Sequence, residues 1–141
     1  MLKISARVEN RQNDHQVTLK TNDQEHILTI PPKSGGFGSS ANGGELLFLA
    51  LATCYCNDIY REAAKRNITV HHVEVDVMGE FDGSPGGPAD GIKYRAVVEA
   101  DASEADILDL MRHTDTVAEI QNTLRRITGV TLEAVEAISL R

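Results

Sequence analysis

The fold of this 141-residue chain is decided by one stretch, Asn42–Ala64, which reads NGGELLFLALATCYCNDIYREAA. Its middle part carries no charge, and charged residues follow from Asp58 onward. The apolar run is too short to span a bilayer, which needs about 20 apolar residues. Together with the charged part it predicts a helix from about Gly44 to Arg66, roughly 34 Å long, with Asn42 as its N-cap. Because the first half of this helix is apolar on all sides, we expect it in the middle of a domain.

The composition of the chain narrows the classes of function. With 25% charged and 41% hydrophobic residues, the sequence fits one globular domain over residues 1–141. A net charge of −7 argues against a nucleic-acid partner and against attraction to anionic membranes. The first residues alternate and lack the apolar core of a signal peptide, and no segment is long enough to span a membrane. Two cysteines two residues apart make no disulfide framework, so we expect a cytoplasmic protein.

Strands are expected on both sides of the helix. Alternating apolar residues predict a half-buried strand over residues 2–8, then strands at His15–Thr21 and Glu25–Ile30 that complete an antiparallel meander. A loop rich in proline and glycine leads from the meander into the helix. After the helix, Thr69–Phe81 and Ile92–Ala100 predict a long hairpin.

Two short helices and a last strand complete the prediction. Ser103 begins a pattern similar to a capping box and predicts a helix through about His113. A second such pattern at Thr116 predicts a helix to about Arg126. Imperfect alternation over Val130–Leu140 predicts a final strand.

The expected order is therefore βββ-α-ββ-αα-β, which is an α+β fold with antiparallel sheets. The apolar helix between the two blocks of strands needs cover on every side. One three-stranded sheet cannot supply that cover. We infer either that sheets from both halves of the chain wrap the helix, or that a second chain does so.

Cys54 and Cys56 have different surroundings. On a helix, residues i and i+2 point about 200° apart, so these two thiols neither bond to each other nor chelate one metal ion. Asp58 and Arg61 follow Cys54 at helical spacing and form a polar stripe with it, whereas small and aromatic residues surround Cys56. Cys54 is therefore the candidate for chemistry and Cys56 a packing residue. The sequence contains none of the common motifs for zinc, nucleotide phosphate or an activated serine.

A nucleophilic Cys54 needs its thiolate form, and a carboxylate such as Asp58 opposes that form. A cation must therefore come from Arg11, Arg61 or a histidine. Two other interpretations stay open. Cys54 is a small buried hydrophobic residue, or it binds a metal ion together with Asp58 or His113, although no spacing suggests further ligands.

The residues around Cys54 also carry a resemblance to a known family. The run Asn42–Leu46 is followed by Ala50, Ala52 and the pair Cys54-Tyr55. This run resembles the OsmC/Ohr family of thiol-dependent peroxidases, as do Gly79-Glu80 in the valine-rich strand and the later Asn122-Thr123-Leu124. The similarity extends over nearly the whole chain.

The resemblance implies an intertwined homodimer in which sheets of two chains wrap the central helices, with sites at the interface. It implies that Cys54 is the reactive cysteine and that Arg11, after the first strand, is the arginine that holds its thiolate. The family glutamate falls at Gly44, so the neighbouring Glu45 is its candidate substitute. The second cysteine of the family falls near Ala118, where this sequence has no cysteine.

Two functions follow from the resemblance. The first is reduction of an organic hydroperoxide by Cys54 in a one-cysteine cycle, with an external thiol as reductant. The second is binding of a small apolar or thiol-containing ligand without peroxidase chemistry. In that case Cys54, Asp58, Arg61 and Glu119 are the candidates to line the site. We expect no cofactor and no metal ion for either function.

Overall fold

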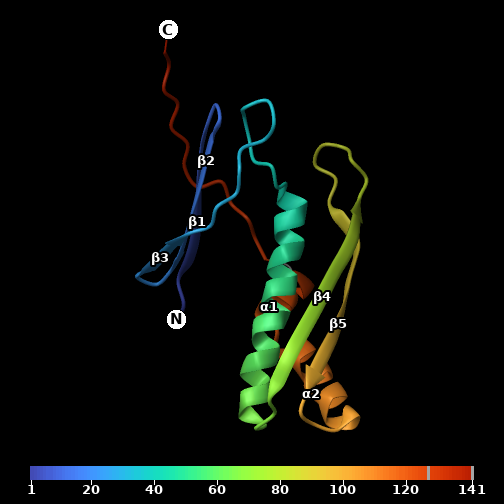
Figure 1. Ribbon diagram of the computed structural model, residues 1–141. Coiled ribbons are helices and arrows are strands. Elements are labelled where there is room, and N and C mark those ends of the chain that lie inside the picture. The colour runs from blue at the N-terminus through green and yellow to red at the C-terminus, as the bar shows by residue number, and fades with distance from the viewer. Residues whose placement is uncertain (127, 141) are drawn as a thin grey trace. The chain divides into compact units, whose positions relative to one another are not determined.

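A computed structural model describes residues 1–126 and 128–140. The chain divides into two compact units, Met1–Leu49 and Ala50–Arg141, and the division falls within the long helix α1 (Gly43–Lys65). Figure 1 shows the elements of each unit along the chain. The described residues form antiparallel sheets and three helices, and this mixed α+β structure confirms the predicted fold class.

The first unit contains a three-stranded antiparallel meander of β1 (Ile4–Arg11), β2 (Asp14–Thr21) and β3 (Gln24–Ile27). Asn13 and Asn22 make its two tight turns at φ values of 60° and 51°, a conformation that asparagine tolerates better than most residues. The predicted meander is confirmed. The predicted half-burial of its first strand is wrong, because every residue of β1 is exposed in the single chain.

Helix α1 begins with a reciprocal cap. The Asn42 Oδ1 atom accepts a hydrogen bond from the Glu45 backbone N–H at 2.8 Å, and Glu45 Oε1 accepts one from the Asn42 N–H at 2.9 Å. These bonds satisfy two backbone donors that a helix start otherwise leaves free. The predicted N-cap is confirmed. Lys65 ends the helix, one residue before the predicted end, and Asn67 follows at a φ of 55°.

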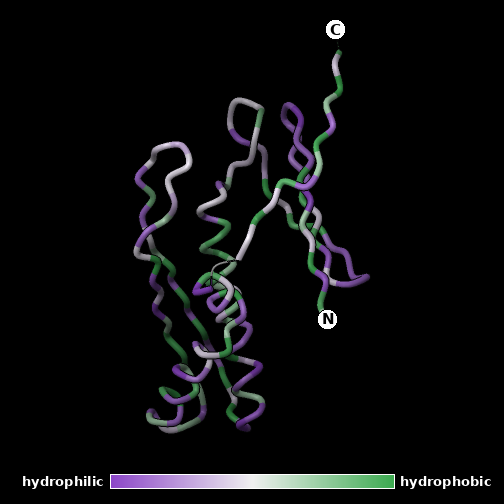
Figure 2. Tube along the Cα trace, turned by 180° about the vertical axis from the view of Figure 1, so that it is seen from behind, coloured by the Kyte–Doolittle hydropathy of each residue, from purple (hydrophilic) through white to green (hydrophobic). Residues whose placement is uncertain are grey.

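The second unit is built on a long hairpin of β4 (Val70–Phe81) and β5 (Ala89–Ala100). The pairing of Phe81 with Ala89 shows that β5 begins three residues before the predicted Ile92 and takes up part of the expected loop. In Figure 2 hydrophobic and hydrophilic residues alternate along both strands, and the loop that joins them is mostly pale. Alternate side chains of the hairpin therefore share one face, which is available for packing.

The core of this unit lies between the hairpin and two helices. Tyr55, Ile59 and Ala63 of α1 meet Leu110 of α2 (Glu104–Val117), and all four are buried. Side chains of both strands pack against this group, and they include Val73, Val75, Tyr94, Ala96 and Val98. Tyr60 of α1 stays 46% exposed in the single chain, and the expected cover of α1 by a second chain stays a prediction.

The helices near the C-terminus start where backbone N–H groups find acceptors. Ser103 Oγ accepts a hydrogen bond from the Asp106 N–H at 3.1 Å, which confirms the first predicted cap. The predicted cap at Thr116 is wrong. Its hydroxyl donates to the His113 carbonyl at 2.6 Å instead, so α2 continues to Val117 and α3 (Glu119–Arg125) begins three residues later than Thr116.

The predicted final strand is absent from the structure. Residues 128–140 carry no helix or strand, and the apolar side chains of this segment are exposed, with Val130 at 97% and Leu132 at 82%. A strand needs an edge to pair with, and no strand of the described residues pairs with this segment. The fold of the single chain is therefore βββ-α-ββ-αα over the residues that the structure describes.

The buried Leu110 offers a test of the second unit's core. Leu110→Ala should lower the free energy of unfolding by about 3 kcal/mol, because it removes a fully buried side chain and leaves a cavity. Leu108→Ala, two residues away and 39% exposed, should cost less than about 1 kcal/mol. Urea denaturation measures both values. Equal losses for the two variants would contradict the proposed core.

Candidate functional site

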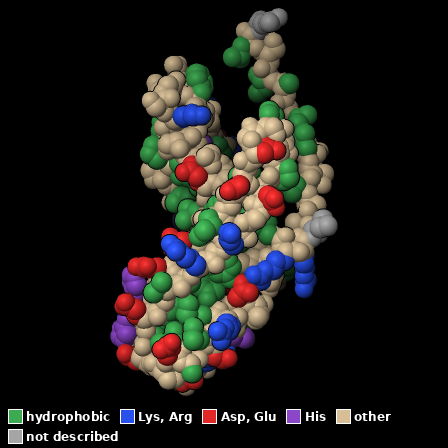
Figure 3. All heavy atoms as spheres, turned by 90° about the vertical axis from the view of Figure 1, so that its right-hand side faces the viewer, with side chains coloured by type: hydrophobic (Ala, Val, Ile, Leu, Met, Phe, Trp, Pro, Cys, Tyr) green, Lys and Arg blue, Asp and Glu red, His purple; other side chains and the backbone are tan. Residues whose placement is uncertain are grey.

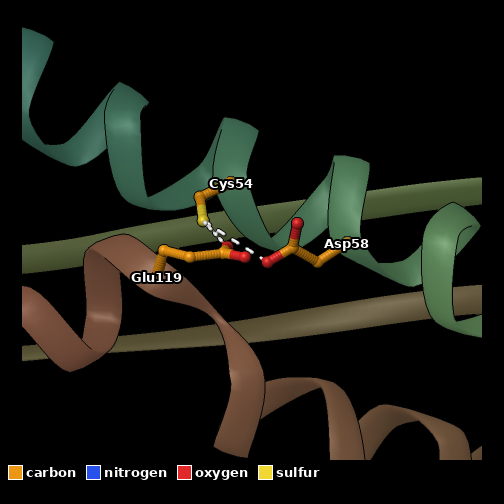
Figure 4. Close-up of side chains that lie close together, drawn as sticks. All are labelled: Cys54, Asp58 and Glu119. Carbon is orange, nitrogen blue, oxygen red and sulfur yellow. Dashed lines mark hydrogen bonds between the residues drawn. The ribbon is translucent and has the colours of Figure 1, made fainter. Parts of the chain in front are cut away.

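Cys54 lies where α1 and α3 come together. Because Cys54 and Asp58 are one helical turn apart, both side chains project from the same side of α1. The Cys54 thiol lies 3.5 Å from Asp58 Oδ2 and 3.6 Å from Glu119 Oε2 of α3, close enough to donate to either carboxylate. Figure 4 shows the two carboxylates converging on the sulfur atom. The thiol is half-buried.

Arg61 forms ion pairs with both carboxylates that face the thiol. Its Nη1 atom lies 3.1 Å from Asp58 Oδ1 and 2.7 Å from Glu119 Oε1, and its Nε donates to Glu62 Oε2 at 2.8 Å. One guanidinium thus serves three carboxylates, two of which also face the thiol. The structure brings together Cys54, Asp58, Arg61 and Glu119, the four residues expected to line a polar site.

Glu62 connects Arg61 to Lys65 of α1 and to His113 of α2 through hydrogen bonds. Its carboxylate is buried and accepts hydrogen bonds from Arg61, from Lys65 Nζ at 3.0 Å and from His113 Nε2 of α2 at 2.9 Å. Hydrogen bonds from Arg61, Lys65 and His113, in this order of weight, lower the pKa of Glu62 to about 2. Glu62 therefore stays ionised and holds the Nε side of the Arg61 guanidinium.

The surroundings of Cys54 disfavour its thiolate. Burial raises the pKa of the Cys54 thiol, and the carboxylates of Asp58 and Glu119 raise it further. A hydrogen bond from the Ile120 backbone acts in the opposite direction and is outweighed. The thiol is therefore mostly protonated at neutral pH in the single chain.

The two carboxylates differ in their affinity for a proton. Burial, followed by the contact with Glu119, raises the pKa of Asp58 to about 6. Burial raises the pKa of Glu119, but hydrogen bonds from its own backbone N–H and from Arg61 outweigh burial and lower this pKa to about 2. Below about pH 6 the pair therefore carries one shared proton, mainly on Asp58.

The other expected residues lie elsewhere. Cys56 lines a separate cavity with Ala52, Thr53, Asn57 and Val75, as its spacing from Cys54 predicts. Glu45 belongs to the first unit, where its carboxylate caps α1. Arg11 ends β1, also in the first unit, and is exposed. Its role as a partner of the Cys54 thiolate stays a prediction.

A metal ion has three candidate ligands here. Cys54, Asp58 and Glu119 each offer one ligand atom, and these atoms lie within 4.8 Å of one another. His113, the alternative ligand, bonds to Glu62 instead. Because Arg61 already supplies positive charge to both carboxylates of the cluster, a metal ion would have to displace that guanidinium. The cluster is better suited to holding a proton than a metal ion.

Glu62 and Gln121 were not singled out from the sequence, and His113 was named there only as a candidate metal ligand. Glu62 and His113 join α1 to α2, and Gln121 donates from α3 to the Leu51 carbonyl at 3.0 Å. Glu62 lies one turn beyond Asp58 on α1, so the sequence alone could place it on the same side of the helix as Asp58. The packing of α2 and α3 against α1 could not be predicted in this way. It depends on contacts between residues that are far apart in the sequence, by 51 positions for His113 and Glu62 and by 70 positions for Gln121 and Leu51.

Comparison with known families identifies the group of proteins to which the chain is related. The family described as OsmC-like protein matches residues 36–133, a range that includes Cys54, Asp58, Arg61 and Glu119. The chain belongs to the OsmC-like family. Among curated proteins, none matches the sequence.

Solved structures share the fold of this OsmC-like protein. An OsmC-like protein from Mycoplasma pneumoniae is 21% identical with a TM-score of 0.60, and the match covers 89% of this chain and 87% of the other. A hypothetical protein from Aquifex aeolicus is 14% identical with a TM-score of 0.61 over the same shares of the two chains. An OsmC-like hydroperoxide resistance protein from Jannaschia sp. is 10% identical, with a TM-score of 0.54 over 90% and 87%. At these identities the comparison establishes the fold.

Helix length and hydropathy bear on membrane insertion. In the part of the OsmC-like chain that the structure describes, no helix has the length and apolar content needed to cross a bilayer.

The carboxylates around Cys54 lead to a testable prediction. In a Cys56→Ser background, Asp58→Asn and Glu119→Gln should each lower the Cys54 pKa, because each removes a negative charge that disfavours the thiolate. Measured by ultraviolet thiolate absorbance, the titration of the parent should lie above the ordinary thiol value of about 8.5. As a control, Glu133→Gln in the C-terminal segment should leave the Cys54 pKa unchanged. A parent pKa below about 7 would contradict this description of the site.

Proposed function

We propose that the protein is a thiol-dependent hydroperoxide reductase whose nucleophile is Cys54. The observation that carries the proposal is a half-buried thiol within hydrogen-bonding distance of two carboxylates, all in the family-matched range. One protein of the same fold, from Jannaschia sp., is named an OsmC-like hydroperoxide resistance protein. Carboxylates beside a thiol provide a place for its proton while the sulfur reacts.

The oxidative step uses these groups as follows. Asp58 or Glu119 takes the thiol proton, and the sulfur attacks the terminal, hydrogen-bearing oxygen of the hydroperoxide. The S–O bond forms as the O–O bond breaks, so the sulfur loses two electrons and becomes a sulfenic acid, while the peroxide is reduced to an alcohol. The proton held by the carboxylate pair passes to the leaving alkoxide. Arg11 would stabilise both the thiolate and this developing charge.

The reductive step needs a partner from solution. Cys56 lines a different cavity from the Cys54 site, so it does not resolve the sulfenic acid. An external thiol attacks the sulfenic sulfur, and water leaves as a mixed disulfide forms. A second thiol then releases Cys54 and departs as a disulfide with the first. Such a cycle suits a cytoplasmic protein, since thiols are kept reduced there.

A second function is favoured by one observation. The pKa of the Cys54 thiol is raised, which is the reverse of what an efficient thiol nucleophile needs. The fold would then serve to bind a small apolar or thiol-containing molecule without reducing a peroxide. Thiol reactivity separates the two functions.

Peroxide consumption tests the first function. With cumene hydroperoxide and dithiothreitol, the protein should consume peroxide at a rate that increases with pH, because the thiolate fraction grows as pH approaches the raised Cys54 pKa. Cys54→Ser should abolish consumption, and Cys56→Ser should retain it. Asp58→Asn should increase the rate near pH 7, because it removes a negative charge that disfavours the thiolate while Glu119 remains as a proton acceptor.

The role of Arg11 is tested in the same assay. Arg11→Ala should lower the rate about a hundredfold, the effect of removing one charge-stabilising donor, whereas Arg7→Ala on the same strand should leave it unchanged. If the wild-type protein consumes no peroxide at any pH, the reductase proposal fails and ligand binding becomes the function to pursue.

We also propose that the protein is a homodimer with its sites at the interface. Large apolar side chains are exposed in both units, among them Ile4, Val8, Leu49, Tyr60, Val97 and Leu124. Figure 3 shows hydrophobic side chains gathered in a strip on one face, with charged side chains beside it. Apolar surface exposed on this scale is typical of a protein that associates. A second chain would also provide cover for the first half of α1.

Light scattering coupled to size exclusion tests this association. The measured mass should be twice the 15.4 kDa of one chain. Leu49→Glu should shift the protein toward monomer, because burying an unpaired carboxylate in an interface is costly. A wild-type protein that is monomeric at micromolar concentration would contradict the proposal.

A further inference from the structure

An open groove of about 410 Å³ runs between α2 and β5 of the second unit, apart from the thiol and its two carboxylates. Its α2 wall consists of residues three or four positions apart, which share one side of the helix: Leu108, Met111, Arg112 and Asp115. None of the exposed apolar side chains named above for the dimer interface lines it. Since a cavity of about 150 Å³ holds benzene, this groove has room for an aromatic ring with a short chain.

The opposite wall presents aromatic rings whose polar ends are already bonded. Tyr94 of β5 and Tyr55 of α1 both line the groove, and their rings meet edge to face with centroids 5.1 Å apart. The Tyr55 hydroxyl donates to the Met111 carbonyl at 2.8 Å, and the Tyr94 hydroxyl donates to Asp115. Across from these rings Leu108 is 39% exposed. The groove therefore offers apolar surface on both walls.

The charged side chains of the groove leave an excess of positive charge. The Asp115 carboxylate is paired with Arg125 Nη2 at 2.6 Å. Arg95 Nε lies 3.4 Å from Asp76 Oδ2, a loose pair of two exposed side chains. Arg112 is exposed and pairs with no other side chain in the part of the chain that the structure describes. On a chain of net charge −7, a guanidinium without a partner beside apolar walls marks a place for an anion with an apolar body.

We propose that this groove binds a small aromatic carboxylate. The planar guanidinium of Arg112 offers parallel N–H donors that match the two oxygens of a carboxylate. The ring packs against Leu108 and Met111, whose thioether sulfur makes favourable contacts with aromatic rings. The proposal does not depend on the chemistry of Cys54. It assigns to the second unit a ligand site of its own.

The acid 3-phenylpropionate and its amide test the site, because they have nearly the same shape and only the acid carries a charge. Titrated into the wild-type protein, the acid should shift the NMR signal of the Met111 methyl group and bind about fivefold more tightly than the amide. The preference should shrink at about 1 M salt, where charges are screened within about 3 Å.

Substitutions of arginine test which cation selects the acid. Arg112→Gln should abolish the preference for the acid and leave the affinity for the amide unchanged, because it removes the charge and keeps an exposed polar side chain. Arg112→Lys should retain part of the preference, since the charge stays but the parallel donors are lost. Arg126→Gln, at an exposed arginine outside the groove, should change neither affinity.

Filling the groove tests where the ring binds. Leu108→Trp should weaken binding of both probes at least fivefold, because the larger side chain occupies the space between the walls. Leu28→Trp, at an equally exposed leucine of the first unit, should leave binding unchanged.

Two results would overturn the proposal. The first is no saturable binding of 3-phenylpropionate up to about 10 mM. The second is equal affinity for the acid and the amide in the wild-type protein. Peroxide plays no part in these titrations, so their outcome is separate from that of the reductase assay.

Discussion

The burial of Ile59 is the constraint on which the second unit depends. This side chain is fully buried between the hairpin and α2, together with Tyr55 and Ala63 from the same face of α1. With that face turned inward, the rotation of α1 about its own axis is fixed. Cys54 and Asp58 come one residue before Tyr55 and Ile59, about 100° around the helix, so they lie at the border of the core, against α3. The position of the thiol therefore follows from packing.

Charge balance explains why so many polar groups surround this border. Asp58 and Glu62 are both buried, and a buried carboxylate is stable only when it is paired and hydrogen-bonded. Arg61 reaches both of them and Glu119 as well, which joins α1 to α3. The thiol contacts the carboxylates of this network and not its cation. The same bonds that stabilise the helix pair thus hold two negative charges beside the sulfur.

Sequence patterns predicted what depends on neighbours along the chain. The caps at Asn42 and Ser103, the meander and the hairpin all rest on local turn and periodicity signals, and the structure confirms them. The grouping of Cys54 with Asp58 follows from helical spacing, whereas Glu119 entered only through family resemblance. The end of α2 was missed because Thr116 bonds back into its own helix, a choice that a capping pattern does not distinguish. The strand expected at 130–140 has the right alternation, but alternation does not supply a pairing edge.

The sheet topology has a consequence for the speed of folding. Within the described part of the chain, both sheets pair only strands that follow one another in the sequence, in the orders β1-β2-β3 and β4-β5. Closing each hairpin brings together residues separated by a short loop, so the entropy lost at each closure is small. Contacts of this kind give a low mean sequence separation, which is associated with fast folding. Most of the β-structure is thus able to form early, before the long-range docking of α2 and α3 against α1 completes the thiol's surroundings.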